Sequence, residues 1–121
     1  MVHNTLPNGK SATANRTRLC KVDDVVEGNP VAVNVPGVQP LAAYRVGDEY
    51  FVTDNVCTHA YSLLTDGFQD GEMIECEVHG GTFDIRTGSA TGFPCRTPLK
   101  TFDVVVADGW ISVISPDSDD Q

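Results

Sequence analysis

Apolar and polar residues alternate with a period of two along much of the chain. Val31, Val33 and Val35 alternate with Ala32 and Asn34, as expected for a strand with one apolar face. The segment LAAYRVGDEYFVTD, residues 41–54, predicts two short strands around a glycine-containing turn. No segment has the 3.6-residue period of an amphipathic helix of useful length, so the pattern favours an all-β fold.

Turn signals recur between these segments. The stretch TFDIRTGSAT, residues 82–91, has a turn at Thr87-Gly88. In TFDVVVADGWISVIS, residues 101–115, Asp108-Gly109 suits a two-residue type I′ turn between strands rich in β-branched residues. Short strands at close spacing predict a small antiparallel β-sandwich or barrel.

The 121 residues predict one domain. Residues 1–18 are polar and predict a flexible N-terminal segment, residues 19–115 form the domain, and residues 116–121 form a short acidic tail. No apolar run approaches the roughly 20 residues of a membrane span, and no export signal is recognisable at the N-terminus. We therefore expect a cytoplasmic protein without a membrane partner.

The formal net charge of −9 argues against nucleic acid as a partner, because a phosphate backbone attracts positive charge. From Asp48 to Asp84 there are nine acidic residues and no lysine or arginine. This segment has two interpretations: a solvated surface that aids solubility, or a docking face steered toward a basic partner.

Cysteine and histidine lie together inside that acidic segment, as Cys57-x-His59 and Cys76-x-x-His79, whereas the remaining histidine, His3, lies in the N-terminal segment. In a cytoplasmic chain, disulfides are disfavoured and metal binding explains paired cysteine and histidine better. Two thiolates and two imidazoles suit Zn²⁺ or an iron–sulfur cluster.

The spacing of the ligands helps to distinguish a zinc site from an iron–sulfur cluster. Structural zinc sites of this type usually space the first pair of ligands by two to four residues, whereas here one residue intervenes and each pair mixes cysteine with histidine. Each half therefore supplies one sulfur and one nitrogen. A Rieske [2Fe–2S] cluster needs this set, because one iron takes both thiolates and the other takes both imidazoles. A structural zinc site remains the alternative.

The stretches CTHAYSLLTDG and IECEVHGGTFDIRTG resemble the two cluster-binding loops of Rieske proteins. Residues 19–115 are similar to the small Rieske ferredoxins of bacterial aromatic-ring-hydroxylating dioxygenases. The resemblance implies a Rieske fold: a small antiparallel β-sandwich or barrel base with a two-loop cluster-binding subdomain at about residues 55–95. It also implies that Cys57 and Cys76 bind the inner iron, and that His59 and His79 bind the outer iron near the surface.

A third, proline-containing loop covers the cluster in this family, and Gly92-Phe93-Pro94-Cys95 matches it in position. The resemblance implies that Cys95 is a packed neighbour of the cluster and no ligand. Cys20 is expected to be a small buried apolar residue, and Trp110 is expected in the core. The expected docking residues surround the outer iron: His59, His79, Ala60, Tyr61, Gly80, Phe93 and Pro94. For Tyr61 and Phe93, shielding of the cluster from water is an equal alternative.

High-potential respiratory Rieske proteins differ from this chain at four readable positions. Their two loops are joined by a disulfide, but the matching residues here are Ser62 and Val78. Their serine and tyrosine hydroxyls near the cluster are matched here by Gly81 and Phe83, which have none. Because hydrogen bonds to the sulfurs raise the potential, we expect the low end of the Rieske range, about −150 mV.

The chain lacks the residues for substrate chemistry of its own. A separate non-heme iron site needs further histidines, and only His3 remains; no glycine-rich nucleotide fingerprint is present. The resemblance implies a soluble, monomeric electron carrier that is not itself an enzyme. It would pass electrons from an NAD(P)H-dependent flavin reductase to the terminal oxygenase of an aromatic-hydrocarbon catabolic system.

Two stretches, PLAAYRVGDEYFVTDNVCTH and PCRTPLKTF, are most similar to ferredoxins of carbazole-type dioxygenases, with naphthalene- and biphenyl-type systems next. Two other hypotheses remain open. One is a zinc-stabilised interaction module. The other is a subunit of a permanent nitrite or arsenite enzyme complex, which the cluster ligands and the missing disulfide make less suitable.

Overall fold

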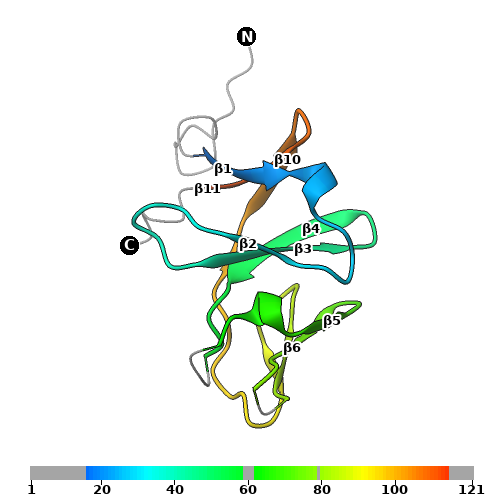
Figure 1. The fold of residues 1–121 in the computed structure, drawn as a ribbon, viewed down its shortest axis with the longest axis vertical. Coiled ribbons are helices and arrows are strands. Elements are labelled where there is room, and N and C mark those ends of the chain that lie inside the picture. The colour runs from blue at the N-terminus through cyan, green and yellow to red at the C-terminus, as the bar shows by residue number, and fades with distance from the viewer. Residues whose placement is uncertain (1–15, 59–61, 79, 115–121) are drawn as a thin grey trace.

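The computed structural model describes residues 16–58, 62–78 and 80–114. In these ranges eleven strands form three antiparallel sheets, with two 3₁₀ turns, η1 (Val22–Asp24) and η2 (Leu64–Asp66), between them (Figure 1). The strands are β1 (Arg16–Lys21), β2 (Val31–Val33), β3 (Leu41–Val46), β4 (Glu49–Asp54), β5 (Phe68–Asp70), β6 (Met73–Glu75), β7 (Thr82–Asp84), β8 (Ala90–Gly92), β9 (Thr101–Phe102), β10 (Val104–Ala107) and β11 (Trp110–Ile114). The described part of the chain contains no α-helix, which confirms the predicted all-β class. Within those ranges, no helical segment has the length and apolar character needed to cross a membrane.

Two sheets form the base of the molecule. The first has the order β1-β11-β10, and the second has the order β2-β3-β4-β9. The predicted hairpin at the C-terminal end is confirmed: β10 pairs with β11, and Asp108 and Gly109 have φ values of 56° and 80°. Two consecutive positive φ angles are what a type I′ turn requires.

Strand β3 is buried on both faces and so connects two hydrophobic clusters. Leu41 and Ala43 belong to a cluster inside the base, whereas Ala42, Tyr44 and Val46 face a second cluster. Alternate residues of a strand point to opposite faces, which explains why the segment LAAYRV is apolar on both faces except at the half-buried Arg45.

The third sheet, β5-β6-β7-β8, lies at one end of the long axis, below the base in Figure 1. Its buried side chains include Ile74 of β6 and Phe83 of β7, which pack with Leu64 and Ile85 in the second cluster. This cluster also contains the three cysteines Cys57, Cys76 and Cys95. The hydrophobic core therefore continues from the base to the cysteine-bearing loops.

Polar side chains fix this sheet to the base. The side-chain amide of Gln69 donates to the carbonyl of Arg45 at 2.8 Å and accepts from the backbone N–H of Gly28 at 3.1 Å. Arg86 forms ion pairs with Glu49 of β4, at 2.8 Å, and with Glu72, at 3.4 Å. These contacts join residues of the base to residues of the β5–β8 sheet.

Two expectations from the sequence differ from the structure. Strand β1 begins at Arg16, which pairs with Ile114, so residues 16–18, expected in a flexible N-terminal segment, belong to a strand. Trp110 is only half buried and belongs to neither hydrophobic cluster, so the expected core position is wrong. Its ring lies beneath Arg18, at 4.9 Å, and near Lys21, at 5.7 Å, and these contacts keep it at the surface of the base.

Candidate metal centre

The first cysteine-bearing loop follows β4 and is closed at its base by hydrogen bonds. The backbone N–H of Cys57 donates to the carbonyl of Ser62 at 2.9 Å. Asn55, which is fully buried, accepts from the backbone N–H of Thr65 through Oδ1 at 2.9 Å and donates through Nδ2 to Thr65 Oγ1 at 3.0 Å. The carbonyl of Asn55 also accepts from Leu64 at 2.7 Å. This network fixes the path of the chain from the end of β4 to Cys57.

The second loop follows β6 and begins at Cys76. The backbone N–H of Cys76 donates to the carbonyl of Gly81 at 2.8 Å, which closes a tight turn. Within this turn Gly80 has a φ of 73°, a conformation that glycine adopts without steric cost. The buried Gly81 then packs directly against the third loop, where Cys95 lies.

The third loop runs from Gly92 to Cys95, and the backbone N–H of Cys95 donates to the carbonyl of Gly92 at 3.1 Å. Thr58 ties the first loop to the chain beyond it, since its hydroxyl donates to the carbonyl of Thr97 at 2.7 Å. Phe93 projects outward, with 77% of its surface exposed, and the Arg96 guanidinium lies 5.8 Å from its ring centroid.

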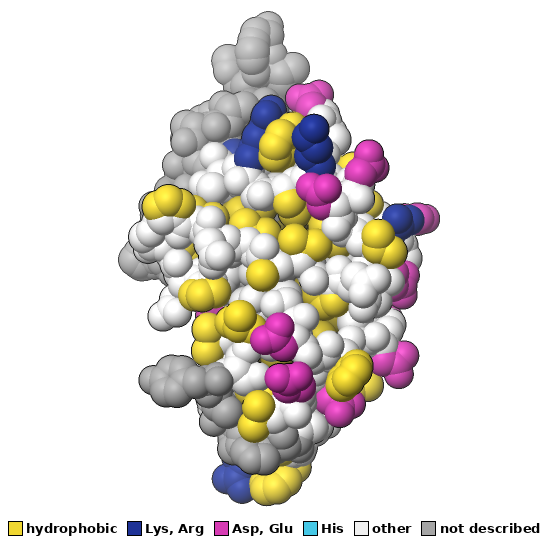
Figure 2. Space-filling view, viewed as in Figure 1, with side chains coloured by type: hydrophobic (Ala, Val, Ile, Leu, Met, Phe, Trp, Pro, Cys, Tyr) yellow, Lys and Arg dark blue, Asp and Glu magenta, His cyan; other side chains and the backbone are white. Residues whose placement is uncertain are grey.

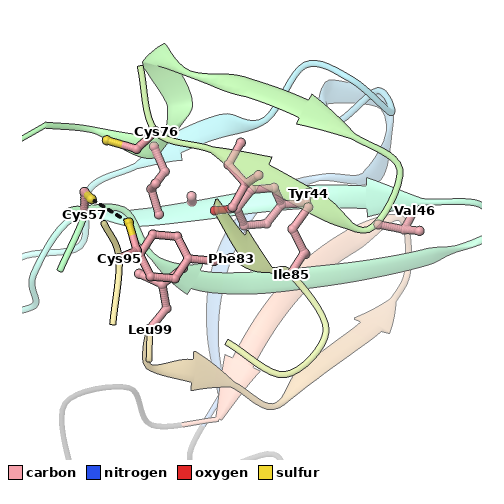
Figure 3. Close-up of a cluster of buried hydrophobic side chains, with 11 residues drawn as sticks. Tyr44, Val46, Cys57, Cys76, Phe83, Ile85, Cys95 and Leu99 are labelled. Atoms are coloured by element: carbon pink, nitrogen blue, oxygen red, sulfur yellow. Dashed lines mark hydrogen bonds between the residues drawn. The ribbon is translucent and has the colours of Figure 1, made fainter. Parts of the chain in front are cut away.

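Three buried cysteines converge where these loops meet (Figure 3). The Sγ atoms of Cys57 and Cys95 lie 3.9 Å apart, and Figure 3 shows Cys76 at the same end of the second hydrophobic cluster. The expectations that Cys95 and Cys20 are buried are confirmed, with Cys20 in the base cluster.

Burial dominates the acid–base chemistry of these thiols. It raises the pKa of Cys76, and the neighbouring Cys57 raises it further, whereas hydrogen bonds with the Val78 backbone and the Ser62 side chain lower it. Burial, together with the charges of Cys57 and Cys76, raises the pKa of Cys95 to about 12. Binding of a soft metal is the chemistry that compensates for two buried thiolates, because the metal charge replaces the lost protons.

Three of the predicted docking residues lie in the described ranges: Gly80 and Phe93 are exposed and Pro94 is half buried. His59, Ala60, Tyr61 and His79 lie outside the described residues. Among the residues that are described, no three His, Cys, Asp or Glu side chains are arranged to hold a metal ion. Within these ranges, the three cysteines are therefore not arranged as a three-thiolate site.

An open hollow of about 400 Å³ lies beside the two loops. Its lining residues are Val56, Ser62, Leu63, Asp66, Glu77 and Val78. Asp66 and Glu77 give it a negative rim. Figure 2 shows acidic side chains spread over the lower half of the molecule, where β5 and β6 lie in Figure 1.

Three small antiparallel sheets that bring cysteines from separate loops together at one end are the architecture of a Rieske-type iron–sulfur protein. Residues 15–103 match the family described as the Rieske [2Fe-2S] domain. The chain therefore belongs to this family, and its cofactor is a Rieske-type [2Fe–2S] cluster.

Within the family, the chain is similar to ferredoxin components of aromatic dioxygenase systems, as the sequence predicted. It is 47% identical over 96 residues to the ferredoxin component of the p-cumate 2,3-dioxygenase system of Pseudomonas putida, covering 78% of this chain and 81% of that protein. A solved Sphingomonas yanoikuyae B1 ferredoxin matches with a TM-score of 0.83 and 53% identity, covering 84% of this chain and 100% of that one. A chain from the complex of reduced oxygenase and oxidized ferredoxin in carbazole 1,9a-dioxygenase matches with a TM-score of 0.78 and 40% identity, covering 83% and 93% of the two chains.

Two features of the site could not be predicted from the spacing of the cysteine and histidine residues. One is the contact of Cys95 with Cys57, which are far apart in the sequence and meet only in the fold. The other is the anchoring of the first loop by Asn55 and Thr65, which are ordinary polar residues in the sequence. A long-range partner of this kind becomes visible only once the strands are paired.

Proposed function

We propose that this protein is a soluble one-electron carrier. It accepts an electron from an NAD(P)H-dependent flavin reductase and delivers it to the terminal oxygenase of a multicomponent aromatic-ring dioxygenase. The observation that carries the proposal is the placement of two buried thiols, Cys57 and Cys76, beside a loop whose Phe93 ring is exposed. Relatives at 47% and 53% identity are ferredoxins, which supports the same role.

In this proposal Cys57 and Cys76 hold one iron, and His59 and His79 hold the other. The bound cluster supplies a reversible one-electron couple. The chain supplies two environments for it: the cysteine side is buried against Phe83 and Leu99 in the second hydrophobic cluster, and the histidine side belongs to the expected docking face. The buried side excludes water, so electrons enter and leave through the exposed end.

The docking face comprises Gly80, Phe93 and Pro94, together with His59, His79, Ala60 and Tyr61. A ring that shields the cluster has to bury its own surface, but Phe93 is 77% exposed, which favours contact with a partner over shielding. Acidic side chains lie above this end on the face that Figure 2 shows, and they steer the molecule toward a basic surface on each redox partner, although Arg96 lies beside Phe93 at the tip itself. A small apolar centre with a charged surround suits weak, rapidly exchanging complexes.

The environment of the thiols supports a low reduction potential. Phe83 is fully buried in the thiol cluster and has no hydroxyl to donate, and Gly81 has no side chain. We place the potential at about −150 mV, the low end of the Rieske range. That value suits a carrier between a flavin reductase and an oxygenase.

The organic substrate of the oxygenase stays a prediction. A carrier does not contact that substrate, so none of its side chains reports on it. The sequence favoured a carbazole-type system, and the relatives include carriers named for both carbazole and p-cumate systems.

The test combines spectroscopy with reconstituted electron transfer. The protein, purified anaerobically, is compared with Cys57→Ser, and with Cys20→Ser as a control at a buried cysteine of the base. We expect the wild type and Cys20→Ser to show a brown-red absorption that bleaches with dithionite and a reduced-state EPR signal of a [2Fe–2S] centre, which Cys57→Ser loses. Added to the reductase and oxygenase of a p-cumate or carbazole system, the wild type restores product formation that depends on NADH.

A colourless protein that contains zinc and no acid-labile sulfide, after expression with sufficient iron, would refute the carrier and establish the zinc-stabilised module. Co-purification as a fixed complex that withstands dilution would favour the subunit of a permanent enzyme. A monomer that turns over with both redox partners supports the shuttle.

A further inference from the structure

Cys95 is the one buried cysteine near the centre to which the proposed function gives no role. Its side chain is 5% exposed, and its Sγ lies 3.9 Å from Cys57 Sγ, within the range of a hydrogen bond between sulfur atoms. Figure 3 shows the Cys95 side chain directed at Cys57 from the opposite loop. The contact is long-range, because 38 positions separate the two residues.

The direction of this hydrogen bond follows from the chemistry of the ligand. A cysteine that binds iron does so as a thiolate, which has no proton to donate and accepts through its lone pairs. Cys95, surrounded by apolar side chains, keeps its proton and is a weak donor. Once Cys57 holds iron, only Cys95 can donate across this contact.

The backbone of the neighbouring loops holds Cys95 in this position. A Cβ atom at residue 81 would collide with Cys95 Sγ, so the glycine there leaves the space that the thiol fills. The backbone N–H of Cys95 is held by the carbonyl of Gly92 at 3.1 Å. The sulfur is therefore confined between Gly81 and Cys57.

The geometry points to Cys95 as a positioning residue whose S–H donates a hydrogen bond to the Cys57 thiolate and thereby raises the reduction potential of the bound cluster. This inference rests on the proposed function. A hydrogen bond to a ligand sulfur offsets part of its negative charge. Because the reduced cluster carries one more electron than the oxidised cluster, this bond stabilises the reduced state more. Cys95 thus provides a thiol donor to Cys57, where Gly81 and Phe83 have no hydroxyl, while the Ser62 side chain hydrogen-bonds to Cys76.

The experiment measures midpoint potentials of the holoprotein in spectroelectrochemical titrations. Cys95→Ala removes the donor, Cys95→Ser replaces it with a stronger one, and Cys20→Ala is a matched control in the base cluster. We expect Cys95→Ala to lower the equilibrium constant for one-electron reduction by up to about tenfold, which corresponds to about 59 mV. Because a hydroxyl is a stronger donor than a thiol, Cys95→Ser should raise the potential above that of the wild type, and Cys20→Ala should leave it unchanged.

A second readout follows the hydrogen bond itself. Resonance Raman spectra of wild type and Cys95→Ala, each prepared in H₂O and in D₂O, should differ in the deuterium sensitivity of the iron–thiolate stretching bands. If Cys95 had only a structural role, the deuterium sensitivity of these bands would be the same in wild type and Cys95→Ala. Equal potentials for wild type and Cys95→Ala, or equal shifts for Cys95→Ala and Cys95→Ser, would overturn the inference, because volume alone would then explain the effect.

The outcomes also separate this inference from the proposed function. If Cys95→Ala does not hold the cluster, Cys95→Ser against wild type decides: a raised potential supports donation, and an unchanged one overturns it. A wild-type protein without a reversible one-electron couple would defeat the carrier proposal itself. A reversible one-electron couple whose potential does not change when residue 95 is substituted would refute only the role of Cys95.

Discussion

A methyl group added at residue 81 tests how tightly the three loops are packed. In Gly81→Ala the new Cβ overlaps Cys95 Sγ and lies 3.2 Å from both the Cβ and the backbone nitrogen of Cys95. The backbone atoms prevent Cys95 from moving aside as a flexible side chain would. The turn that begins at Cys76 is equally fixed, since its N–H is bonded to the carbonyl of Gly81 at 2.8 Å.

Overpacking of this kind costs about 1–3 kcal/mol. For a domain of this size, each kcal/mol lowers Tm by about 4–8 °C, so we expect Gly81→Ala to melt roughly 5–20 °C below the wild type. Cys95→Ala removes the overlapping sulfur. The double variant should therefore be more stable than the sum of the single effects by about 1 kcal/mol, although not fully restored, because the 3.2 Å contacts remain.

The assay is thermal unfolding of the holoprotein at one heating rate, followed by circular dichroism and by loss of visible absorption. Gly80→Ala is the matched control on the same turn: its positive φ of 73° makes any side chain strained, but among the described residues its Cβ would meet only a Glu75 carboxylate oxygen, at 3.5 Å. Cys95→Ala should not rescue this control. Strict additivity of Gly81→Ala and Cys95→Ala would refute the packing that we derive for the loops.

Three further predictions concern other parts of the molecule. Tyr44→Phe leaves Thr53 Oγ1 without the 2.9 Å hydrogen bond of a buried pair, so stability at pH 7 should fall by about 1 kcal/mol in thermal melts. Burial raises the pKa of Tyr44 despite the Thr53 hydrogen bond, so its contribution is complete below about pH 10 and falls as the pH rises further; the gap between wild type and Tyr44→Phe should narrow there. Asn55→Leu removes both side-chain hydrogen bonds to Thr65 and should speed loss of the cluster on dilution into chelator. Asn55→Asp keeps the acceptor for the Thr65 N–H and should lose the cluster more slowly than Asn55→Leu. Phe93→Ser should raise the KM for this carrier in the oxygenase assay several-fold with spectrum and Tm unchanged; an unchanged KM would remove Phe93 from the docking face.

Local patterns in the sequence predicted most of the fold. The period-two segments became β3, β4, β10 and β11, and the Asp108-Gly109 turn formed as its residue types require. These features depend on neighbours in the chain, which a sequence displays directly. Trp110 was misplaced because burial depends on tertiary context: cationic side chains of β1 cover the ring where an apolar layer was expected.

The site divides in the same way. The spacing of Cys57 and Cys76 predicted them as a pair of iron ligands, which stays a prediction, and the structure buries both in one cluster. The contact between Cys95 and Cys57 had no local signal, since it depends on the third loop folding back over the first. Periodicity and motif spacing describe residues that are close in the sequence. They therefore do not predict contacts between residues that only the fold brings together.

The loops also show how the chain holds a metal centre without a covalent bridge between them. Ser62 and Val78, which stand where respiratory Rieske proteins have a disulfide, both line the hollow beside the loops, so the fold brings the two positions to one place. Hydrogen bonds close each loop separately, from Cys57 to Ser62 and from Cys76 to Gly81. Each loop is therefore stabilised by its own turn and by packing on Cys95, and the hydrogen bond between the Ser62 side chain and the Cys76 thiol joins the two loops. Loss of the cluster should loosen the tip while leaving the base sheets folded, because the base has its own hydrophobic cluster.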